Sequence, residues 1–188
     1  AAWLADATAA EATYGHISTW DTSRVTDMGM LFCASSYYCG TTAAASFNEN
    51  IGAWDTSGVT TMYAMFLGAW SFNEDIGAWD TSGVTSMNRM FNGGSAFNQD
   101  IGNWAVHSVT DMGYMFQDAS AFDQDIGNWA VQSLTTMSYM FLRAYSFNQN
   151  LGWCVKVGIL WVFDNTPCMS SSCGVVKMDN CPTPAPTD

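Results

Sequence analysis

The centre of the chain carries, from Ser71 to Phe91, the stretch SFNEDIGAWDTSGVTSMNRMF. The following stretch, from Ala96 to Phe116, restates it as AFNQDIGNWAVHSVTDMGYMF. The tryptophans belong to a series with a constant spacing of 25 residues, which runs through Trp54, Trp79, Trp104 and Trp129. Five copies of the motif are recognisable, and a sixth loses the pattern after Trp153. A fixed period of this length is typical of architectures in which repeats stack on one another.

The repeat also suggests what each unit folds into. A unit of 25 residues is too short to bury its own apolar face, so neighbouring units must stack. Met87, Met90 and Phe91 have the spacing of a helical turn, and Ser86 before them is a good N-cap residue. The segments 76–79 and 84–85 favour short strands. We therefore predict a solenoid of short parallel strands, with one short helical turn in each coil and a continuous core of Trp, Phe and Met.

Composition excludes several classes of partner. The 188 residues include 17 Asp and Glu but 5 Lys and Arg, which gives a formal net charge of −12. This balance argues against nucleic acid, whose phosphates need basic groups, and against an anionic membrane surface. The apolar fraction of 48% is enough for a packed core. No apolar run approaches the roughly 18 residues of a transmembrane helix, so direct membrane insertion is not expected.

The repeats divide the chain into parts. Residues with helical spacing near the start predict an N-terminal helical cap, and they are Trp3, Leu4, Ala7 and Ala10. We expect the helical cap over residues 1–19 and the solenoid over 20–153, with its Cys-containing insert at 33–46. A Cys-rich C-terminal cap follows over 154–181, and a Pro/Thr-rich linker or tail over 182–188. In the tail, Thr183 and Thr187 are candidates for O-glycosylation. Because the chain starts at Ala1, we expect that a signal peptide was removed or that the chain is a fragment.

The six cysteines lie outside the regular coils, which favours disulfides. The short gap between Cys33 and Cys39 predicts a local bridge. Among the four later cysteines three pairings are open, and order along the chain favours Cys154 with Cys168 or Cys181; the fourth is Cys173. A disulfide-stapled cap is physically expected where the last coil would expose its core. A zinc site is the disfavoured alternative, because no histidine lies nearby. Disulfides indicate an oxidising compartment.

The motif WDTSxVTxMxxMF, followed by FNQDIGxW, resembles the repeat of the BspA-like, leucine-rich-repeat-type surface proteins, the DUF285 group. The resemblance covers Trp20 to about Trp153. The Ala-rich start that ends in Tyr14-Gly15-His16-Ile17 resembles the leader of algal and other protist members. The resemblance implies a leucine-rich-repeat-like, right-handed solenoid in an extracellular or surface-anchored protein. It implies no enzymatic activity and supplies no catalytic motif; apart from a candidate Ca²⁺, we expect no cofactor.

Stacking turns each unit position into a column along the molecule. Asp75, Asp100 and Asp125 share a column, and carboxylates about 5 Å apart repel one another. A Ca²⁺ ion between coils would relieve this repulsion; the alternative is that each carboxylate accepts N–H bonds from its own turn. For the column of Asn48, Asn73, Asn98, Asp123 and Asn148 we expect a buried ladder of amides.

Two threonine columns raise the alternative of ice binding, because regular threonine arrays on a flat face order water. The longer column consists of Thr26, Thr60, Thr85, Thr110 and Thr135. The shorter one consists of Thr22, Thr56 and Thr81. Val106 and Val131 interrupt the shorter column, which makes ice binding less favoured than the alternatives below.

Aromatic residues outside the core pattern are the candidate contact surface. They are Tyr37, Tyr38, Trp70 and Tyr145, joined by Tyr114 and Tyr139 on the exposed side of the predicted helical turn. A carbohydrate-binding module would stack sugar rings on Trp70, Tyr114 and Tyr139.

Catalysis has little support in the sequence. His16 and His107 are the only histidines, and no Ser or Cys partner is evident for either. No glycine-rich phosphate loop or metal-hydrolase motif is present. We therefore expect a non-enzymatic extracellular structural or interaction module of a cell-surface or fibril-forming protein. It would serve adhesion or assembly, with itself or with other surface proteins and glycans, and a carbohydrate-binding surface module is the alternative.

Overall fold

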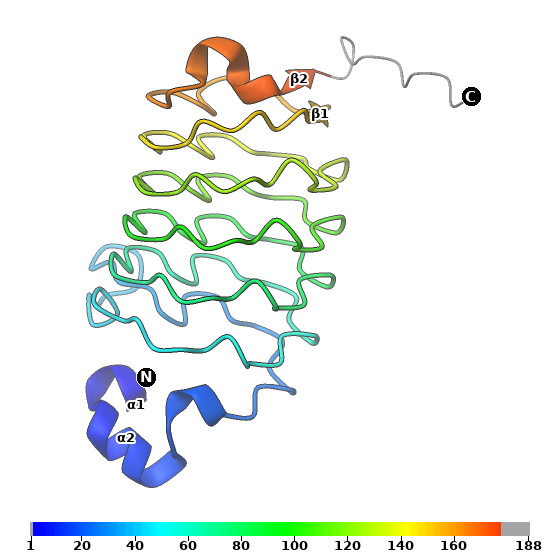
Figure 1. Cartoon of the computed structure of the whole chain (residues 1–188). Coiled ribbons are helices and arrows are strands. Elements are labelled where there is room, and N and C mark those ends of the chain that lie inside the picture. The colour runs from blue at the N-terminus through cyan, green and yellow to red at the C-terminus, as the bar shows by residue number, and fades with distance from the viewer. Residues whose placement is uncertain (1, 178–188) are drawn as a thin grey trace.

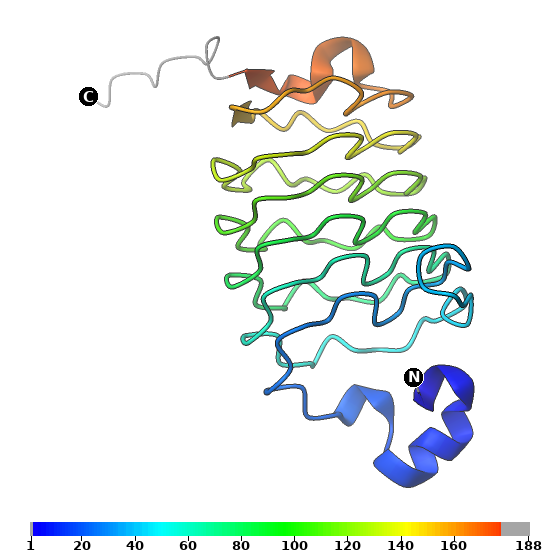
Figure 2. The same ribbon diagram turned by 180° about the vertical axis from the view of Figure 1, so that it is seen from behind.

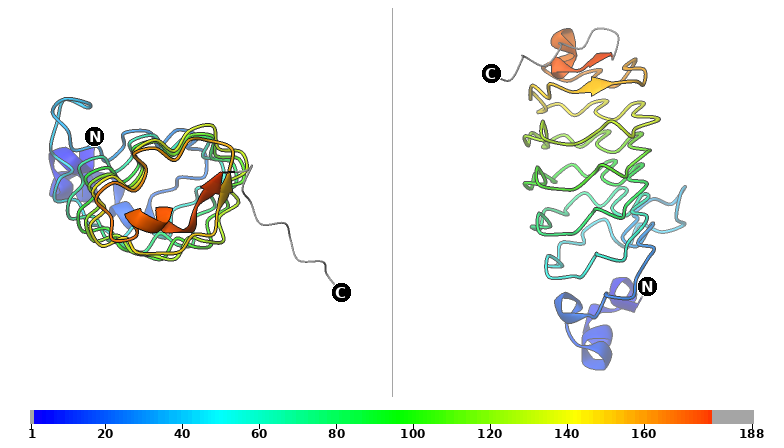
Figure 3. Two further views of the ribbon diagram at one scale, coloured as in Figure 1. Left: turned by 90° about the horizontal axis from the view of Figure 1, so that it is seen from above. Right: turned by 90° about the vertical axis from the view of Figure 1, so that its right-hand side faces the viewer.

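The computed structural model describes residues 2–177, and they form an elongated stack of coils (Figure 1). The reverse view shows the same layers running the length of the stack (Figure 2). Seen along its axis, successive coils superimpose around a common centre (Figure 3). No helix within residues 2–177 is long and apolar enough to cross a membrane.

Three short helices close the N-terminal end of the stack. They are α1 (Ala2–Ala5), α2 (Ala7–Tyr14) and the 3-10 helix η1 (Ile17–Thr19). Asp6 separates the first two and caps α2, because its carboxylate accepts the N–H of Ala9 at 3.0 Å. Trp3 of α1 is buried and meets the ring of Trp20 edge-on at 6.0 Å between ring centroids. The single predicted capping helix is thus broken into pieces.

Each coil is hydrogen-bonded to the next through alternate residues. The N–H groups of Met87, Arg89 and Phe91 donate to the carbonyls of Asp111, Gly113 and Met115 at 3.0, 2.9 and 2.9 Å. The intervening residues close tight turns, such as the bond from the Met90 N–H to the Met87 carbonyl at 3.1 Å. The chain therefore zigzags along this side of every coil.

The predicted helical turn in each coil is wrong. No helix lies between Trp20 and Trp153. At the centre of the turn, Arg89 has a φ of 60°, in the left-handed region. A helix would need N–H bonds to carbonyls four residues earlier, whereas these N–H groups are used between coils. The i, i+3, i+4 burial of Met87, Met90 and Phe91 comes from the zigzag instead.

The predicted strands are also largely absent. Segments 76–79 and 84–85 contain no strand, and Ile76 and Trp79 close a turn instead, with the Trp79 N–H 3.2 Å from the Ile76 carbonyl. In the regular coils, parallel pairing consists of isolated bridges at the residue that follows the second predicted strand of each unit. These residues are Asp27, Thr61, Ser86, Asp111 and Thr136. The constant turns leave room for only one residue of strand per coil.

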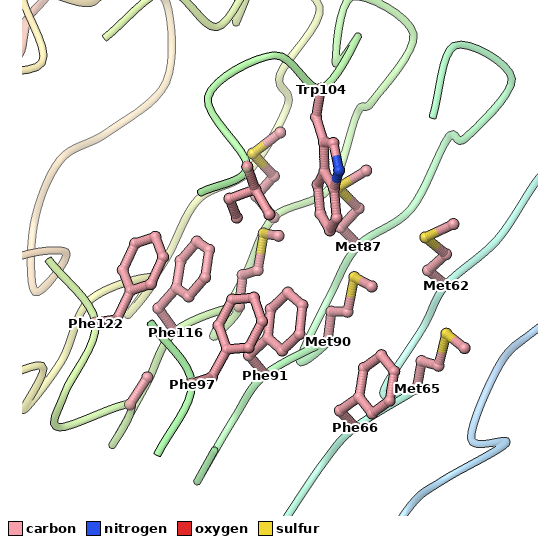
Figure 4. Close-up of a cluster of buried hydrophobic side chains, with 14 of the residues drawn as sticks. Met62, Met65, Phe66, Met87, Met90, Phe91, Phe97, Trp104, Phe116 and Phe122 are labelled. Atoms are coloured by element: carbon pink, nitrogen blue, oxygen red, sulfur yellow. The ribbon is translucent and has the colours of Figure 1, made fainter. Parts of the chain in front are cut away.

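The core consists of three columns of aromatic rings. The indoles of Trp79, Trp104 and Trp129 stack at 6.5 Å between centroids and within 5° of parallel. Figure 4 shows the adjacent phenylalanine columns with the buried methionines beside them. Phe91 stacks on Phe97 of the second column at 3.9 Å. Repetition alone brings identical rings face to face, and all of these side chains are buried.

The C-terminal end departs from the regular coil. It contains strand β1 (Cys154–Val155), the 3-10 helix η2 (Met169–Gly174) and strand β2 (Val176–Lys177). β1 and β2 pair in parallel, with Cys154 opposite Val176 and Val155 opposite Lys177. A disulfide joins Cys168 to Cys173. This pairing overturns the expected bridge between Cys154 and Cys168, and a bridge from Cys154 to Cys181 stays a prediction because Cys181 lies outside the described residues.

Candidate functional site

The 33–46 insert is held against the side of the stack by a disulfide. Cys33 and Cys39 are bonded to each other, the pairing expected from their spacing. Cys33 packs with Ala64 and Leu67 in a small second hydrophobic cluster outside the main core. The loop that the bridge closes stands out from the stack (Figure 3). It presents Tyr37 with 87% of its surface exposed.

From this loop an aromatic stripe runs along the stack, consisting of Tyr37, Tyr38, Arg89, Tyr114 and Tyr139. The rings of Tyr37 and Tyr38 meet edge-on at 5.0 Å. The Arg89 guanidinium lies 5.1 Å from the centre of the Tyr38 ring and 3.9 Å from that of Tyr114. Tyr114 stacks on Tyr139 at 5.0 Å. Cation–π and ring contacts thus connect residues from the insert and three successive coils.

The backbone explains why these side chains face outward. Arg89, Tyr114 and Tyr139 occupy equivalent positions, with φ values of 60°, 59° and 59°. The left-handed conformation at the middle of the zigzag turns their side chains away from the core that Met87 and Met90 enter. Bulky residues seldom adopt this conformation. The earlier coils place Met30 and Ala64 there in the same conformation, so the geometry belongs to the repeat and the aromatic character to these coils.

The structure brings together only part of the predicted contact surface. Tyr37, Tyr38, Tyr114 and Tyr139 lie in the stripe. Trp70 and Tyr145 are exposed, at 58% and 59%, but they belong to a different column. Ser95 and Ser120 lie between them in that column: the Ser95 hydroxyl donates to the Trp70 carbonyl and that of Ser120 to the Ser95 carbonyl.

Arg89 and Trp161 are contact residues that the sequence analysis missed. Arg89 could have been found by aligning the repeats, since it takes the position of Tyr114 and Tyr139. Trp161 has a φ of 64° and lies two residues before Phe163, as Tyr139 does before Phe141. Because the last coil is shortened, the fixed period of 25 residues does not reach Trp161.

A pocket of about 250 Å³ opens between the last two coils, which we call the wedge pocket. On one side it is lined by Thr136, Ser138 and Tyr139. On the other side lie Leu160 and Trp161, of which Trp161 is 51% exposed. The wedge pocket therefore continues the aromatic stripe by one coil.

The aspartate column that suggested calcium is used for turns. Asp75, Asp100 and Asp125 each accept the N–H of the glycine two residues later at 2.9 Å. This is the structural alternative to a metal site. Among residues 2–177, no group of three or more His, Cys, Asp or Glu side chains is placed to hold a metal ion.

A second set of aspartates makes the same kind of turn with serines. The hydroxyl and N–H of Ser57 donate to Asp55 at 2.7 and 3.0 Å, and these bonds lower the pKa of Asp55. Hydrogen bonds from Ser82 likewise lower the pKa of Asp80. Both sets of aspartates are accordingly turn formers on the surface.

The asparagine column forms the expected ladder, but it is not buried. The side-chain oxygen of Asn73 accepts the N–H of Asn98 at 2.9 Å, and that of Asn98 accepts the N–H of Asp123 at 2.9 Å. Asn98 is exposed and Asn73 half-buried. The ladder runs along the outside because the phenylalanines that precede each member fill the interior.

The two threonine columns do not share a face. In the longer column each hydroxyl after that of Thr26 donates to the threonine carbonyl of the preceding coil, as Thr85 does to Thr60 at 3.1 Å, and all members are exposed. Thr56 and Thr81 of the shorter column are 2% and 0% exposed. The two-file array on which ice binding depended is therefore absent within residues 2–177.

His16 does have a serine neighbour, contrary to expectation. Its Nδ1 lies 2.8 Å from the Ser18 hydroxyl, and its Nε2 lies 3.6 Å from a Glu49 carboxylate oxygen. The same Nδ1 accepts the Ser18 N–H at 3.3 Å and caps η1. Because the ring is occupied by this local cap at the end of the stack, its role there is structural. His107 is exposed.

The O-glycosylation candidates Thr183 and Thr187 lie outside the described residues, as does Cys181. The two disulfides within residues 2–177 are those of a protein from an oxidising compartment.

Comparison with known proteins gives a family and no function. The family described as "Mycoplasma protein of unknown function, DUF285" matches residues 5–40 and 36–154, which include the regular coils and the insert. No curated protein and no solved structure matches the chain. The match spans most of the chain and coincides with the 25-residue repeat. The chain therefore belongs to the DUF285 family of BspA-like repeat proteins.

Proposed function

We propose that the chain is a non-enzymatic, extracellular interaction module of a cell-surface or fibril-forming protein, from an algal or protist-like member of the family. In this proposal a leucine-rich-repeat-like, right-handed solenoid is the scaffold, and adhesion or protein–protein assembly is the function. The observation that carries the proposal is the aromatic stripe, a row of two exposed and two half-buried tyrosine rings with one half-buried cation, on an otherwise acidic molecule.

The scaffold supports a recognition role because its buried polar side chains are hydrogen-bonded and its interior is closely packed. Within residues 2–177 no buried side-chain nitrogen or oxygen lacks a hydrogen-bond partner. Buried rings stack in every coil, so the surface positions are held by a close-packed interior. A binding surface on such a support loses little conformational entropy when a partner docks.

The stripe has the composition of a protein-binding surface. Tyrosine and arginine are enriched at the energetic centres of interfaces, because they combine a large apolar area with polar groups. Tyr37 is almost fully exposed on a loop that the Cys33–Cys39 bridge restrains. The guanidinium of Arg89 is already positioned by Tyr114 at 3.9 Å. These features favour docking of another protein surface, including a second copy of this chain.

Charge and cysteine chemistry support the compartment and the class of partner. The net charge of −12 favours neutral or basic protein surfaces over nucleic acid and anionic membranes. Disulfides persist in secreted proteins.

Sedimentation velocity of the oxidised full chain over a range of concentrations, with negative-stain microscopy, tests the proposal. We expect concentration-dependent association, weakened about tenfold or more by Tyr37→Ser with Tyr38→Ser, a loss of at least about 1.4 kcal/mol. Tyr145→Ser is the matched control, since Tyr145 is exposed but lies outside the stripe. Single rods at every concentration would remove the self-assembling version of the proposal.

A further inference from the structure

The fifth coil lacks two hydrogen bonds that every earlier coil makes. In four coils the methionine that opens the zigzag and the residue two positions later both donate their N–H groups to the next coil, starting with Met28 to Thr61 and Met30 to Tyr63. The corresponding N–H groups of Met137 and Tyr139 make no hydrogen bond with any residue in 2–177. Both residues line the wedge pocket.

A shortened segment explains this gap. Trp129 and Phe141 are separated by twelve positions, as in the other regular coils, whereas Trp153 and Phe163 are separated by ten. Pairing resumes beyond the gap, where the Phe141 N–H donates to the Val162 carbonyl at 2.9 Å. The chain therefore takes a shorter path opposite Met137 and Tyr139, and the space that this leaves between the two coils is the wedge pocket.

We propose that the wedge pocket binds one ring of a neutral saccharide. Met137 is fully buried, but Tyr139 is half-buried, and its unpaired N–H requires an acceptor oxygen. Sugar hydroxyls accept and donate equally well. The hydroxyls of Thr136 and Ser138 lie 3.3 Å apart on the same wall and supply further partners of both kinds. An apolar cavity with a few convergent polar groups is the usual form of a small-molecule site.

The aromatic walls suit the apolar face of a pyranose. Trp161 is 51% exposed, and Tyr139 lines the opposite wall with its ring stacked on that of Tyr114. Flat rings bury C–H groups while their polar edges stay solvated. The volume of about 250 Å³ is of the size of one sugar unit rather than of a long chain.

Two other ligand classes fit less well. An anionic sugar would meet N–H dipoles but no cation, since none of the side chains that line the pocket is basic; the net charge of −12 would also repel it. An extended peptide gains affinity from a row of main-chain bonds, and here the Tyr139 N–H is the one unpaired donor of the two that lies on a partly exposed residue. The neutral saccharide uses both the donors and the rings.

The inference rests on the proposed role as an interaction module and is tested by titrating the oxidised full chain. The probes are maltose, cellobiose and α-mannobiose, with a sulfated disaccharide and an uncharged tetrapeptide as competing classes. We expect saturable binding of at least one neutral disaccharide by saturation-transfer NMR and calorimetry. Trp161→Ala should weaken it about tenfold or more, the effect of losing an aromatic anchor.

Two further variants separate the pocket from the rest of the surface. A Cβ added at Gly158, which lines the wedge pocket, meets no atom within 4 Å, so Gly158→Leu should add bulk at the pocket without disturbing the fold and weaken binding. Trp70→Ala removes an equally exposed tryptophan elsewhere and should leave binding unchanged. Melting curves establish that each variant is folded.

The inference is overturned if no neutral disaccharide binds, if the sulfated sugar or the peptide binds more tightly, or if Trp70→Ala is as damaging as Trp161→Ala. Sedimentation of the same samples distinguishes the two proposals. Association that persists without sugar binding removes the saccharide site alone, whereas loss of both removes the interaction module.

Discussion

The regular coils over residues 51–150 and the terminal coil over residues 154–177 solve the same packing problem differently. In the regular coils the buried phenylalanines stack on their counterparts in neighbouring coils, and alternate N–H groups pair with the next coil. At the terminal coil the indole column has ended at Trp153, and a disulfide closes the chain. Facing it, the N–H groups of Met137 and Tyr139 in the last regular coil have no partner within residues 2–177.

This difference between the regular and terminal coils shows that a constant repeat length has two structural effects. It places identical side chains in register, and it keeps the number of residues around the coil constant so that the backbones can pair. The terminal coil keeps the first property in part, since Phe163 still stacks on Phe141 at 5.5 Å. It loses the second, and the wedge pocket opens where the shortened path no longer follows its neighbour.

The largest expected effect on stability comes from removing one buried ring, and the loss should differ between the two regions. Phe91→Ala removes a ring stacked on both neighbouring coils and should lower the free energy of unfolding by about 3–5 kcal/mol. Phe163→Ala should cost about 2 kcal/mol, because the end of the stack can relax around the cavity. Urea unfolding followed by near-UV circular dichroism measures both, and equal losses would contradict the distinction.

An intermediate effect comes from the disulfide of the terminal coil. Cys168→Ser with Cys173→Ser should destabilise that coil by about 2 kcal/mol, the value for a short closed loop. The N–H of Leu151, which donates to the Cys173 carbonyl at 2.8 Å, should then exchange faster in hydrogen-exchange experiments.

The matched control for this bridge is Cys33→Ser with Cys39→Ser, which should speed exchange only in the 33–46 insert. If opening of either bridge spread through the regular coils, the two regions would be one cooperative unit.

The smallest effect compares two members of the asparagine ladder. Asn98→Ala leaves the N–H of Asp123 without its acceptor and should cost about 1 kcal/mol. The side-chain oxygen of Asn148 accepts no hydrogen bond within residues 2–177, so Asn148→Ala should change stability by less than about 0.5 kcal/mol. Thermal unfolding of both variants tests the ladder; a larger loss for Asn148→Ala would mean that backbone geometry dominates.

The sequence was sufficient to identify the buried residues and their arrangement in columns. The Trp79, Met87 and Phe91 positions recur with a period that only stacking can bury. The local conformation could not be predicted in the same way. The Met87–Met90–Phe91 spacing fits a helical turn as well as it fits a zigzag, and pairing between coils, which the sequence shows only indirectly, selects the zigzag.

The candidate site was predicted in part for a similar reason. Tyr114 and Tyr139 are visible as departures from the core pattern. Their contact with Arg89 depends on the left-handed backbone at that position, which a helical interpretation conceals. The wedge pocket depends on a shortage of two residues before Phe163, and where such a shortage is absorbed depends on the three-dimensional path.

Three successive indoles of the Trp column donate to the carbonyl 28 residues earlier. The Nε1 groups of Trp79, Trp104 and Trp129 donate to the carbonyls of Ile51, Ile76 and Ile101 at 3.2, 3.1 and 3.1 Å. The boundaries between these central coils thus repeat the same bond. An in-frame duplication of one unit in the gene would create no unfamiliar interface, and a deletion would leave no mismatched one. Evolution can therefore lengthen or shorten this molecule in whole coils while the two specialised ends stay as they are.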